Sequence, residues 1–476
     1  MISRVVGRGL VPSYPLFLLI LLQSQDLGQS NGLENSALGY YYEYMILGAL
    51  NSKVRHEQTH EVLNYCSQFA WFLKNGEKQK VSDKDFRAFH SAFEDKFDLS
   101  INYEGRRRTL IEANIFLLTD EEIGFRYPYS YFFFLGRFLS RNLEDQEIVG
   151  FIGECCKNLH VRELGNAMLF LAHHSTDGTV VFDALKKSID SRFSTVKPLA
   201  FNHDTAKLDD YVENLPALVF SKENELAVRN NVQIHNEGVE VGLDGILVSK
   251  DFSDDDEAQR IVLDLLAEIN GLIRGVEILG SALKANFGSI DSKTKQSLID
   301  TLFQGGLRAL RSFVEIFAAT PEGVMAELIE ALQMGDNGSG SKAIREKAIK
   351  VKIFQVVGRL SFWFIHRVGS SVGSRSMSPA IDRYIKTNDT VANRLVAMAG
   401  KLETPDPITL AELRELNGRV LKSAFAQSVL RWIVYSRIHM YRTAEREKQQ
   451  ICEELGIRIE LQHAIDFKTK ATKRIS

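Results

Sequence analysis

The sequence predicts a mainly α-helical protein with one small β hairpin in its first third. Three observations support this fold class. Only 9 of the 476 residues are proline, which favours long helices over a turn-rich β sandwich. After Ala258, apolar residues recur at helical spacing over several turns. Between Thr109 and Leu143, apolar segments flank the charged sequence TDEEIG, which is typical of a tight turn between two short strands.

The stretch from Thr109 to Leu143 organises the first half of the chain. Its hairpin ends at Phe125 and continues into an aromatic run, FRYPYSYFFFLGRFLSRNL. Pro128 suits the first turn of a helix, where its missing N–H costs no hydrogen bond. The helix that follows is apolar nearly all round, and such helices are buried on several sides. We therefore expect it to be the central helix of its domain.

Residues 1–54 are expected to form a helical segment. Arg4 and Arg8 precede a short apolar run and superficially resemble the start of a signal peptide. However, Pro12 and Pro15 interrupt the approach to this run, and no Ala-x-Ala site follows it. The run is also well short of the roughly 20 apolar residues that span a membrane. We interpret it as a buried helix and expect no membrane association.

Residues 55–143 have the element order of a winged-helix-like domain. Apolar residues at helical spacing predict a helix over 57–75. Ser82 offers a side-chain oxygen that would cap the next helix, since SDKD also places acidic residues at its positive end. Arg106 lies at the start of a third short helix, just before the hairpin. Three helices followed by a small β wing is the order of such a domain.

The rest of the chain divides by composition and periodicity. Short helices of similar length follow one another over residues 144–200, and we expect them to form stacked helical pairs. Periodicity fades over 201–257, where Asn, Asp and Glu accumulate, so this range is interpreted as a linker or irregular excursion. Long helices over 258–467, including continuous ones over roughly 342–368, 378–402 and 409–447, predict an antiparallel helical bundle. A basic tail, 468–476, is expected to fray.

Composition narrows the function classes. The net charge of −3 argues against a general nucleic-acid binder, which usually carries a clear basic excess. The four cysteines include an adjacent pair, Cys155 and Cys156, and no CxxC motif occurs. This usage is typical of a reduced compartment rather than of a disulfide framework. We therefore expect a cytoplasmic protein that does not bind nucleic acid.

The sharpest catalytic motif is HEQTH at residues 56–60. On a helix, His56 and His60 would share one face and could bind zinc, with Glu57 as general base. A zinc-dependent hydrolase is therefore one alternative function. The context argues against it, because charged residues flank the motif and His90 would have to serve as an improvised third ligand. The competing interpretation is a solvated helix face.

A second candidate is the run Arg106, Arg107 and Arg108. It stands where a winged helix could touch a phosphate backbone, so a DNA-binding protein is another alternative. Acidic neighbours such as Glu121 and Glu122 dilute that positive field. We favour a solvated face or a contact to another domain.

Two further motifs are expected to be structural. His173 and His174 suit the negative end of a helix, which they would close before a turn. Residues 335–342 resemble a phosphate loop, but Ser341 stands where the order G-x-x-x-x-G-K-[ST] requires lysine. This segment is interpreted as a linker, and no Walker A loop occurs in the chain.

The first part of the chain resembles bacterial STAND-class P-loop NTPases, the NACHT and AP-ATPase relatives. The sequence GLVPSYPLFLLILLQ, residues 9–23, is similar to the Gly-Leu-Pro-Leu region of that class, with Gly9, Leu10, Pro15 and Leu16 matching. The aromatic run from Phe125 is similar to one in large bacterial STAND-type proteins, several of them implicated in phage defence. The resemblance covers roughly residues 1–200.

This resemblance implies a function. The Walker elements of the class lie N-terminal to the matched region, so the chain would be the C-terminal part of a switch without its nucleotide-binding core, from a truncated or split gene. Its winged-helix part would pack on a core or protein partner supplied separately, and its C-terminal helices would sense a ligand or partner. We therefore expect a non-catalytic regulatory or interaction protein without catalytic residues, cofactor or metal. The partner, the oligomeric state and whether Met1 is the native start are open at this stage.

Overall fold

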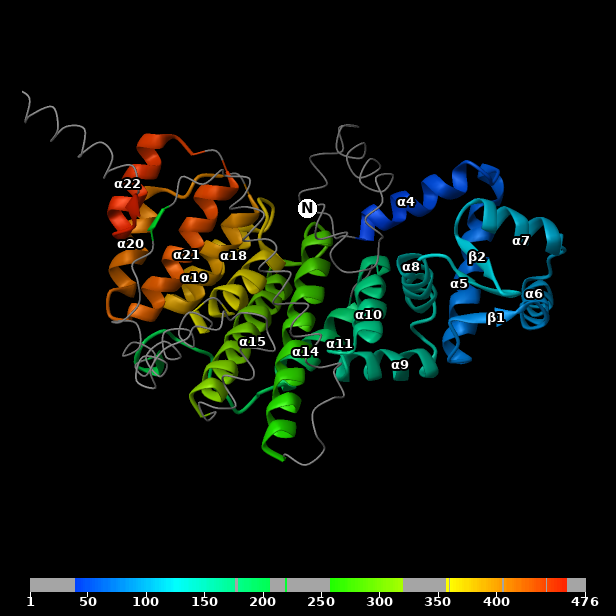
Figure 1. The fold of residues 1–476 in the computed structure, drawn as a ribbon, viewed down its shortest axis with the longest axis horizontal. Helices are drawn as coiled ribbons and strands as arrows, with labels where there is room; N and C mark the ends of the chain where they lie inside the picture. Colours follow the sequence, from blue (N-terminus) through cyan, green and yellow to red (C-terminus); the bar gives the residue numbers. More distant parts are fainter. Residues whose placement is uncertain are drawn as a thin grey trace, which may run out of the picture. The chain divides into compact units, whose positions relative to one another are not determined.

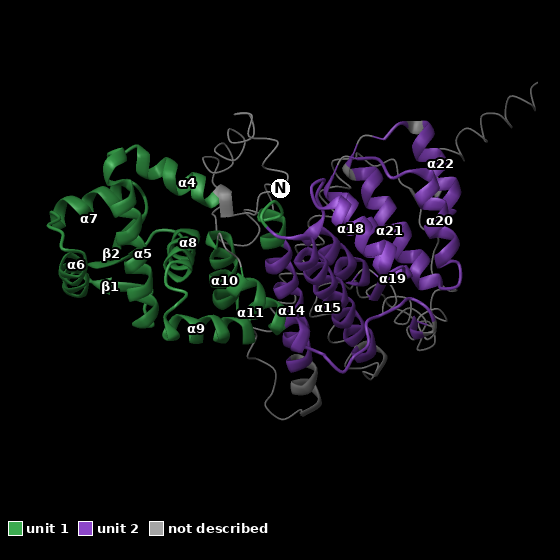
Figure 2. Cartoon of the chain, turned by 180° about the vertical axis from the view of Figure 1, so that it is seen from behind, with its two compact units in different colours: residues 1–188, 281–289 green, residues 189–280, 290–476 purple. Residues whose placement is uncertain are grey.

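The computed structural model is mainly helical, with one small antiparallel sheet of three strands (Figure 1). This confirms the predicted fold class. The chain forms two compact units, drawn in different colours in Figure 2. Unit 1 comprises residues 1–188 and 281–289, and unit 2 comprises residues 189–280 and 290–476. The structure describes residues 39–175, 179–205, 219–220, 257–319, 357–358, 360–404, 406–441 and 443–459.

Several sequence-based expectations lie outside the described residues. They are the first helix and the Gly-Leu-Pro-Leu-like sequence within residues 1–38, most of the linker 201–257, the phosphate-loop look-alike 335–342 and the basic tail 468–476.

After α4, unit 1 contains the three helices α5, α6 and α7 and a hairpin in the expected order, with one additional strand. Ser82 caps the second of these helices as predicted, because its Oγ accepts a hydrogen bond of 3.2 Å from the backbone N–H of Asp85. The additional strand, β1, is only three residues long and carries too little alternation to be recognised in the sequence. The elements are α4 (Gly39–Asn51), η1 (His56–Gln58), α5 (Thr59–Asn75), β1 (Lys80–Ser82), α6 (Asp83–Phe97), α7 (Tyr103–Glu112), β2 (Phe116–Thr119) and β3 (Glu122–Phe125).

The sheet has strand order β1-β3-β2, and both pairings are antiparallel. Asp120 and Glu121 form the two-residue turn between β2 and β3, with φ of 52° and 64°. Positive φ at both positions is the type I′ geometry, whose twist matches that of the flanking strands. Gly124 lets β1 approach closely, since a Cβ there would lie 2.6 Å from the carbonyl oxygen of Gln79.

The aromatic helix α8 (Pro128–Ser140) is the central helix of unit 1, as the sequence predicts. Pro128 occupies its first turn, and Phe133, Phe134 and Leu139 are almost completely buried. Gly136 permits a close approach to α10 (Arg162–His174), because a Cβ there would meet the backbone of Phe170 at 2.5 Å. The remaining helices of this stack are α9 (Gln146–Lys157) and α11 (Thr179–Ser191).

The described part of unit 2 is helical apart from one short pair of parallel strands. Two helices that the periodicity predicts as continuous, 378–402 and 409–447, are each broken. Thr390 and Ser423 cap new helices at the breaks by accepting hydrogen bonds from backbone N–H groups. The elements are η2 (His203–Thr205), β4 (Val219–Phe220), α14 (Glu257–Ala285), α15 (Ser292–Ala319), a helical run over 360–372, α18 (Ser378–Thr387), α19 (Val391–Gly400), η3 (Lys401–Glu403), α20 (Leu410–Val420), α21 (Ala424–Met440), α22 (Glu445–Leu455) and β5 (Arg458–Ile459).

The helical run 360–372 meets its neighbours through glycines. A Cβ on Gly306 of α15 would lie 2.1 Å from Cγ2 of Val368, and one on Gly280 of α14 would lie 2.5 Å from Oγ of Ser371. Gly369 faces α19, where a Cβ would lie 2.6 Å from the backbone nitrogen of Gly400. Real Cβ atoms do not approach this closely, so these helices cross at distances that only glycine permits.

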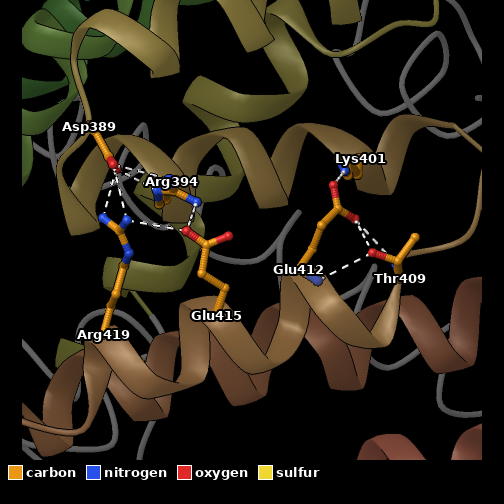
Figure 3. A network of polar contacts seen from close by, with 7 residues as sticks. All are labelled: Asp389, Arg394, Lys401, Thr409, Glu412, Glu415 and Arg419. Carbon is orange, nitrogen blue, oxygen red and sulfur yellow. Dashed lines mark hydrogen bonds and ion pairs between the residues drawn. The ribbon is translucent and has the colours of Figure 1, made fainter.

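Charged residues join α19 and α20 at both ends (Figure 3). At one end Asp389 accepts hydrogen bonds from both Arg394 and Arg419. At the other end Lys401 contacts Glu412, whose carboxylate also completes a capping box with Thr409. Both arrangements are surface ion pairs, which contribute modestly to stability and chiefly fix how the two helices align.

Candidate functional site

The HEQTH sequence lies on the surface of unit 1. It spans the junction of η1 and α5, and His56, Glu57 and His60 are exposed. Within the described ranges, no group of three or more His, Cys, Asp or Glu side chains is arranged to hold a metal ion. The two histidines therefore lie where the solvated-face interpretation puts them.

His90, the improvised third ligand, lies in the core instead. It is 4% exposed, and its Nδ1 lies 3.0 Å from the Tyr65 hydroxyl. Its Nε2 lies 3.1 Å from the carbonyl oxygen of Ile101. Both ring nitrogens therefore have protein partners, and the ring joins α5, α6 and the loop before α7.

Arg106 is a buried residue that joins α7 to α5. Its Nη2 lies 2.7 Å from Glu61, and its side chain is 8% exposed. The guanidinium also lies over the ring of Tyr65, 5.6 Å from the ring centre. Because burying a guanidinium is costly without a counter-charge, Glu61 makes this position possible. Arg106 thus contacts a partner inside its own unit.

Arg107 belongs to a charge-balanced cluster between α6 and α7. It lies 3.3 Å from Glu104 and 3.6 Å from Asp83, and Arg87 contacts both of these carboxylates at 2.8 Å. A hydrogen bond from the Tyr103 hydroxyl lowers the pKa of Asp83, and the two arginines add to this effect. Two guanidiniums and two carboxylates leave no net positive charge here.

The outer surface of this region is mixed in charge. Arg108 is exposed on α7, whereas the hairpin tip carries Asp120, Glu121 and Glu122, all three of which are at least partly exposed. Glu121 holds a left-handed conformation that is unusual for a side chain of its size, so the hairpin presents a carboxylate on a tightly defined turn.

His173 and His174 end α10, as the sequence predicts. The Nε2 of His174 lies 3.0 Å from the carbonyl oxygen of Phe133 on α8. Burial lowers the pKa of His174 to about 3, and the nearby His173 and Arg137 act in the same direction. His174 is therefore neutral at physiological pH, and its position joins the two most closely packed helices of unit 1.

The four cysteines and the aromatic residues 362–364 lie in the core. All four cysteines are buried free thiols, and burial raises the pKa of Cys452 to about 11. Phe362, Trp363 and Phe364 are almost completely buried, which fits core packing rather than a membrane-surface helix. In the described part of the chain, no helix is both long enough and apolar enough to cross a membrane.

Sequence reasoning missed the partners that decide what the arginines do. Glu61 precedes Arg106 by 45 residues, and Asp83 precedes Arg107 by more than 20. Only the fold brings these charges together. The one local signal was that Glu61 lies on an amphipathic helix among buried apolar residues, whereas α7, which carries Arg106, is polar and has little amphipathic character.

Comparison with known proteins identifies one similarity, and it falls on this region. The family described as Novel STAND NTPase 4 matches residues 79–135, which run from the start of β1 into α8. The match covers well under half of the 476-residue chain. Neither the curated proteins nor the solved structures include a match to the chain. The segment that carries α6, α7 and the hairpin is therefore similar to part of a STAND-type NTPase.

Proposed function

We propose that this chain is a non-catalytic regulatory component of a STAND-type switch, and that residues 55–143 form a winged-helix-like domain that docks on protein. The similarity of residues 79–135 to a STAND NTPase family is the observation that carries this proposal. The order α5, β1, α6, α7, β2 and β3 supports the winged-helix assignment. A cytoplasmic role in phage defence is the setting that the sequence resemblance implies.

The charge distribution favours a protein partner over duplex DNA. In helix-turn-helix proteins the recognition helix supplies base and phosphate contacts. The corresponding helix here, α7, has Arg106 buried against Glu61 and Arg107 within a neutral cluster. The hairpin tip is acidic, so it would repel phosphates. A partner with a basic surface would complement that tip.

The decisive experiment measures nucleotide turnover by a STAND-type nucleotide-binding core with and without this chain. Cores encoded in the same genome and matching the same family are the partners to test. We expect the chain alone to be inactive towards ATP, and we expect it to slow ADP release from its cognate core. Glu121→Lys should weaken that effect because it reverses the charge of the hairpin tip.

A matched variant keeps this test specific. Glu144→Lys makes the same charge change at an exposed position beyond residues 79–135, and it should leave the effect on ADP release unchanged. If no core responds to the chain and the purified chain instead binds duplex DNA with a steep salt dependence that Arg108→Ala reduces, the DNA-binding alternative replaces this proposal. If stoichiometric zinc is present and is lost in His60→Ala, the hydrolase alternative replaces it.

A further inference from the structure

A cavity of about 70 Å³ lies within unit 2, between α20, α21, α22 and the loop that precedes α20. Aliphatic side chains from all three helices line it: Leu413, Val434, Ile438 and Ile451. Two charged residues, Arg437 and Glu447, also line it. The wall is thus apolar and polar in nearly equal measure, and the cavity is much smaller than the roughly 300–1,000 Å³ of sites for drug-sized ligands.

Arg437 is the unusual member of this wall. Its side chain lies on α21 and the residue is 6% exposed. Nη1 donates to the carbonyl oxygens of Lys401 and Thr404, and Nη2 donates to that of Asp406 at 2.6 Å. The guanidinium carbon lies 3.9 Å from the ring centre of Tyr441. These bonds use three of the five N–H groups of a guanidinium, and a side-chain hydrogen bond with Tyr441 uses a fourth, which leaves one N–H for a further acceptor.

The groups that accept hydrogen bonds from the Arg437 guanidinium are neutral. Three of them are backbone carbonyl groups, and among the described residues no carboxylate lies within ion-pair distance of the guanidinium. The nearby carboxylate of Asp406 accepts instead from Arg375, at 3.0 and 3.2 Å. Burial lowers the pKa of Arg437, while Tyr441 and the carboxylates of Asp406 and Glu447 act in the opposite direction.

We propose that this cavity binds a short-chain aliphatic monocarboxylate, with the carboxylate on Arg437 and the alkyl chain against the aliphatic wall. A planar guanidinium edge matches a carboxylate, as the pair of Arg375 and Asp406 demonstrates. Cavity size limits the alkyl chain: benzene, with six carbons, occupies an engineered cavity of about 150 Å³, so roughly half that volume suits about three carbons, the length of the propyl group of butyrate.

Contacts at the start of α20 hold the wall of the cavity in place. Leu413 follows directly after Glu412, which completes the Thr409 capping box and pairs with Lys401 (Figure 3). The carbonyl of Lys401 is itself an acceptor for Arg437. The start of α20 and the guanidinium are therefore positioned by the same short segment, and a ligand would meet a site that is largely preformed.

The test is a titration of the full-length protein with sodium butyrate, followed by saturation-transfer NMR and calorimetry. We expect saturable binding in the millimolar range, with butan-1-ol and butylamine at least about tenfold weaker because neither can pair with a guanidinium. Saturable binding that prefers butylamine, or no saturable butyrate binding, would overturn the proposal.

Three variants locate the site without removing Arg437, whose bonds to the loop make its replacement hard to interpret. Val434→Phe fills the cavity from α21, so butyrate binding should be lost while circular dichroism and the unfolding midpoint stay close to those of the parent. Glu447→Gln removes the carboxylate that repels the ligand, so butyrate should bind a few-fold more tightly. Glu453→Gln makes the same change at an exposed position of α22 and should leave affinity unchanged.

Two results with these variants would contradict the proposal. Equal butyrate affinity in the parent and a folded Val434→Phe variant would place the ligand elsewhere. Equal gains from Glu447→Gln and Glu453→Gln would indicate only a general effect of net charge. The site is independent of the proposed STAND role, because the readout is ligand binding to this chain alone.

Discussion

The two units pack their helices with different emphasis, although the contact of Gly136 with α10 shows that unit 1 also has a glycine at a helix crossing. In unit 1, large aromatic rings fill the space between elements: Phe69 alone lies within about 6 Å of the rings of Phe72, Phe86, Phe89, Phe116 and Phe125. In unit 2, glycines remove side chains from the crossing points, so that backbone meets backbone or a small side chain.

This difference predicts which substitutions should destabilise each unit. A core built from large rings loses stability when a ring is removed, because a cavity remains. A core built on close backbone approach loses stability when a methyl group is added, because backbone atoms cannot move aside as a flexible side chain can. Removing a large ring should therefore cost most stability in unit 1, whereas adding a methyl group to a glycine should cost most in unit 2.

The largest expected effect is on the aromatic core of unit 1. Phe69→Ala should destabilise unit 1 by about 4 kcal/mol, since Phe69 is fully buried and its removal leaves a large cavity. Hydrogen exchange resolved by segment measures this without assuming that the two units unfold together. Protection should fall in α5, α6 and the hairpin. Phe72→Ala, at a ring that is 37% exposed, is the control and should cost about 1 kcal/mol or less.

The next effect tests the glycine contacts of unit 2. Gly369→Ala should destabilise unit 2 by about 3 kcal/mol, because its Cβ would lie 2.6 Å from backbone atoms of α19. Exchange should speed up in α19 and in residues 360–372 and stay unchanged in α5. A stability equal to that of the parent would mean that these helices can separate, and the contrast between the units would not hold.

Gly418 provides the matched control for that experiment. It lies on α20 in the same unit, and no atom lies within 4 Å of where its Cβ would be. Gly418→Ala should therefore stabilise α20 by about 0.5 kcal/mol through helix propensity alone. The opposite signs expected for the two glycines separate close packing from backbone entropy.

A smaller effect concerns the buried ion pair of unit 1. Arg106→Met should cost about 2 kcal/mol, less than for a fully buried pair, because Glu61 is 26% exposed and can be hydrated when its partner is lost. Denaturant unfolding of the parent and variant measures it. Arg108→Met, at an exposed neighbour, should stay within about 0.5 kcal/mol of the parent. Equal costs would show that Arg106 contributes through its apolar stem rather than its charge.

Features encoded locally could be predicted from the sequence. The hairpin at TDEEIG, the Ser82 cap, the first-turn Pro128 and the buried aromatic helix each depend on residues within one or two turns. The helix breaks at Thr390 and Ser423 were also encoded locally, as capping residues. They were missed because apolar periodicity continues across both breaks.

Features that join distant residues could not be predicted. Nothing near Arg106 in the sequence indicates that Glu61 neutralises it, and nothing near Gly369 indicates that it meets Gly400. The candidate roles of the arginines depended on exposure, which is a property of the fold. The Arg437 cavity likewise forms only where three helices and a loop meet, and the residues that line it do not belong to a recognisable sequence motif.

The smallest effect is the pH dependence of the surface ion pairs between α19 and α20. Hydrogen bonds from Arg394, followed by those from Arg419, lower the pKa of Asp389 to about 2, against about 3.9 in an unfolded chain. Its contribution is therefore fully present above pH ~4 and is lost as the pH falls through about 2. Because the side chains are 24–38% exposed, the contribution should be only about 0.5 kcal/mol.

The stability difference between the parent and Asp389→Asn should thus be constant near neutral pH and shrink towards pH 2. It should also shrink in about 1 M salt, which screens exposed charges. A difference that persists at pH 2 would mean that Asp389 acts through hydrogen bonds that its neutral form also makes, rather than through its charge.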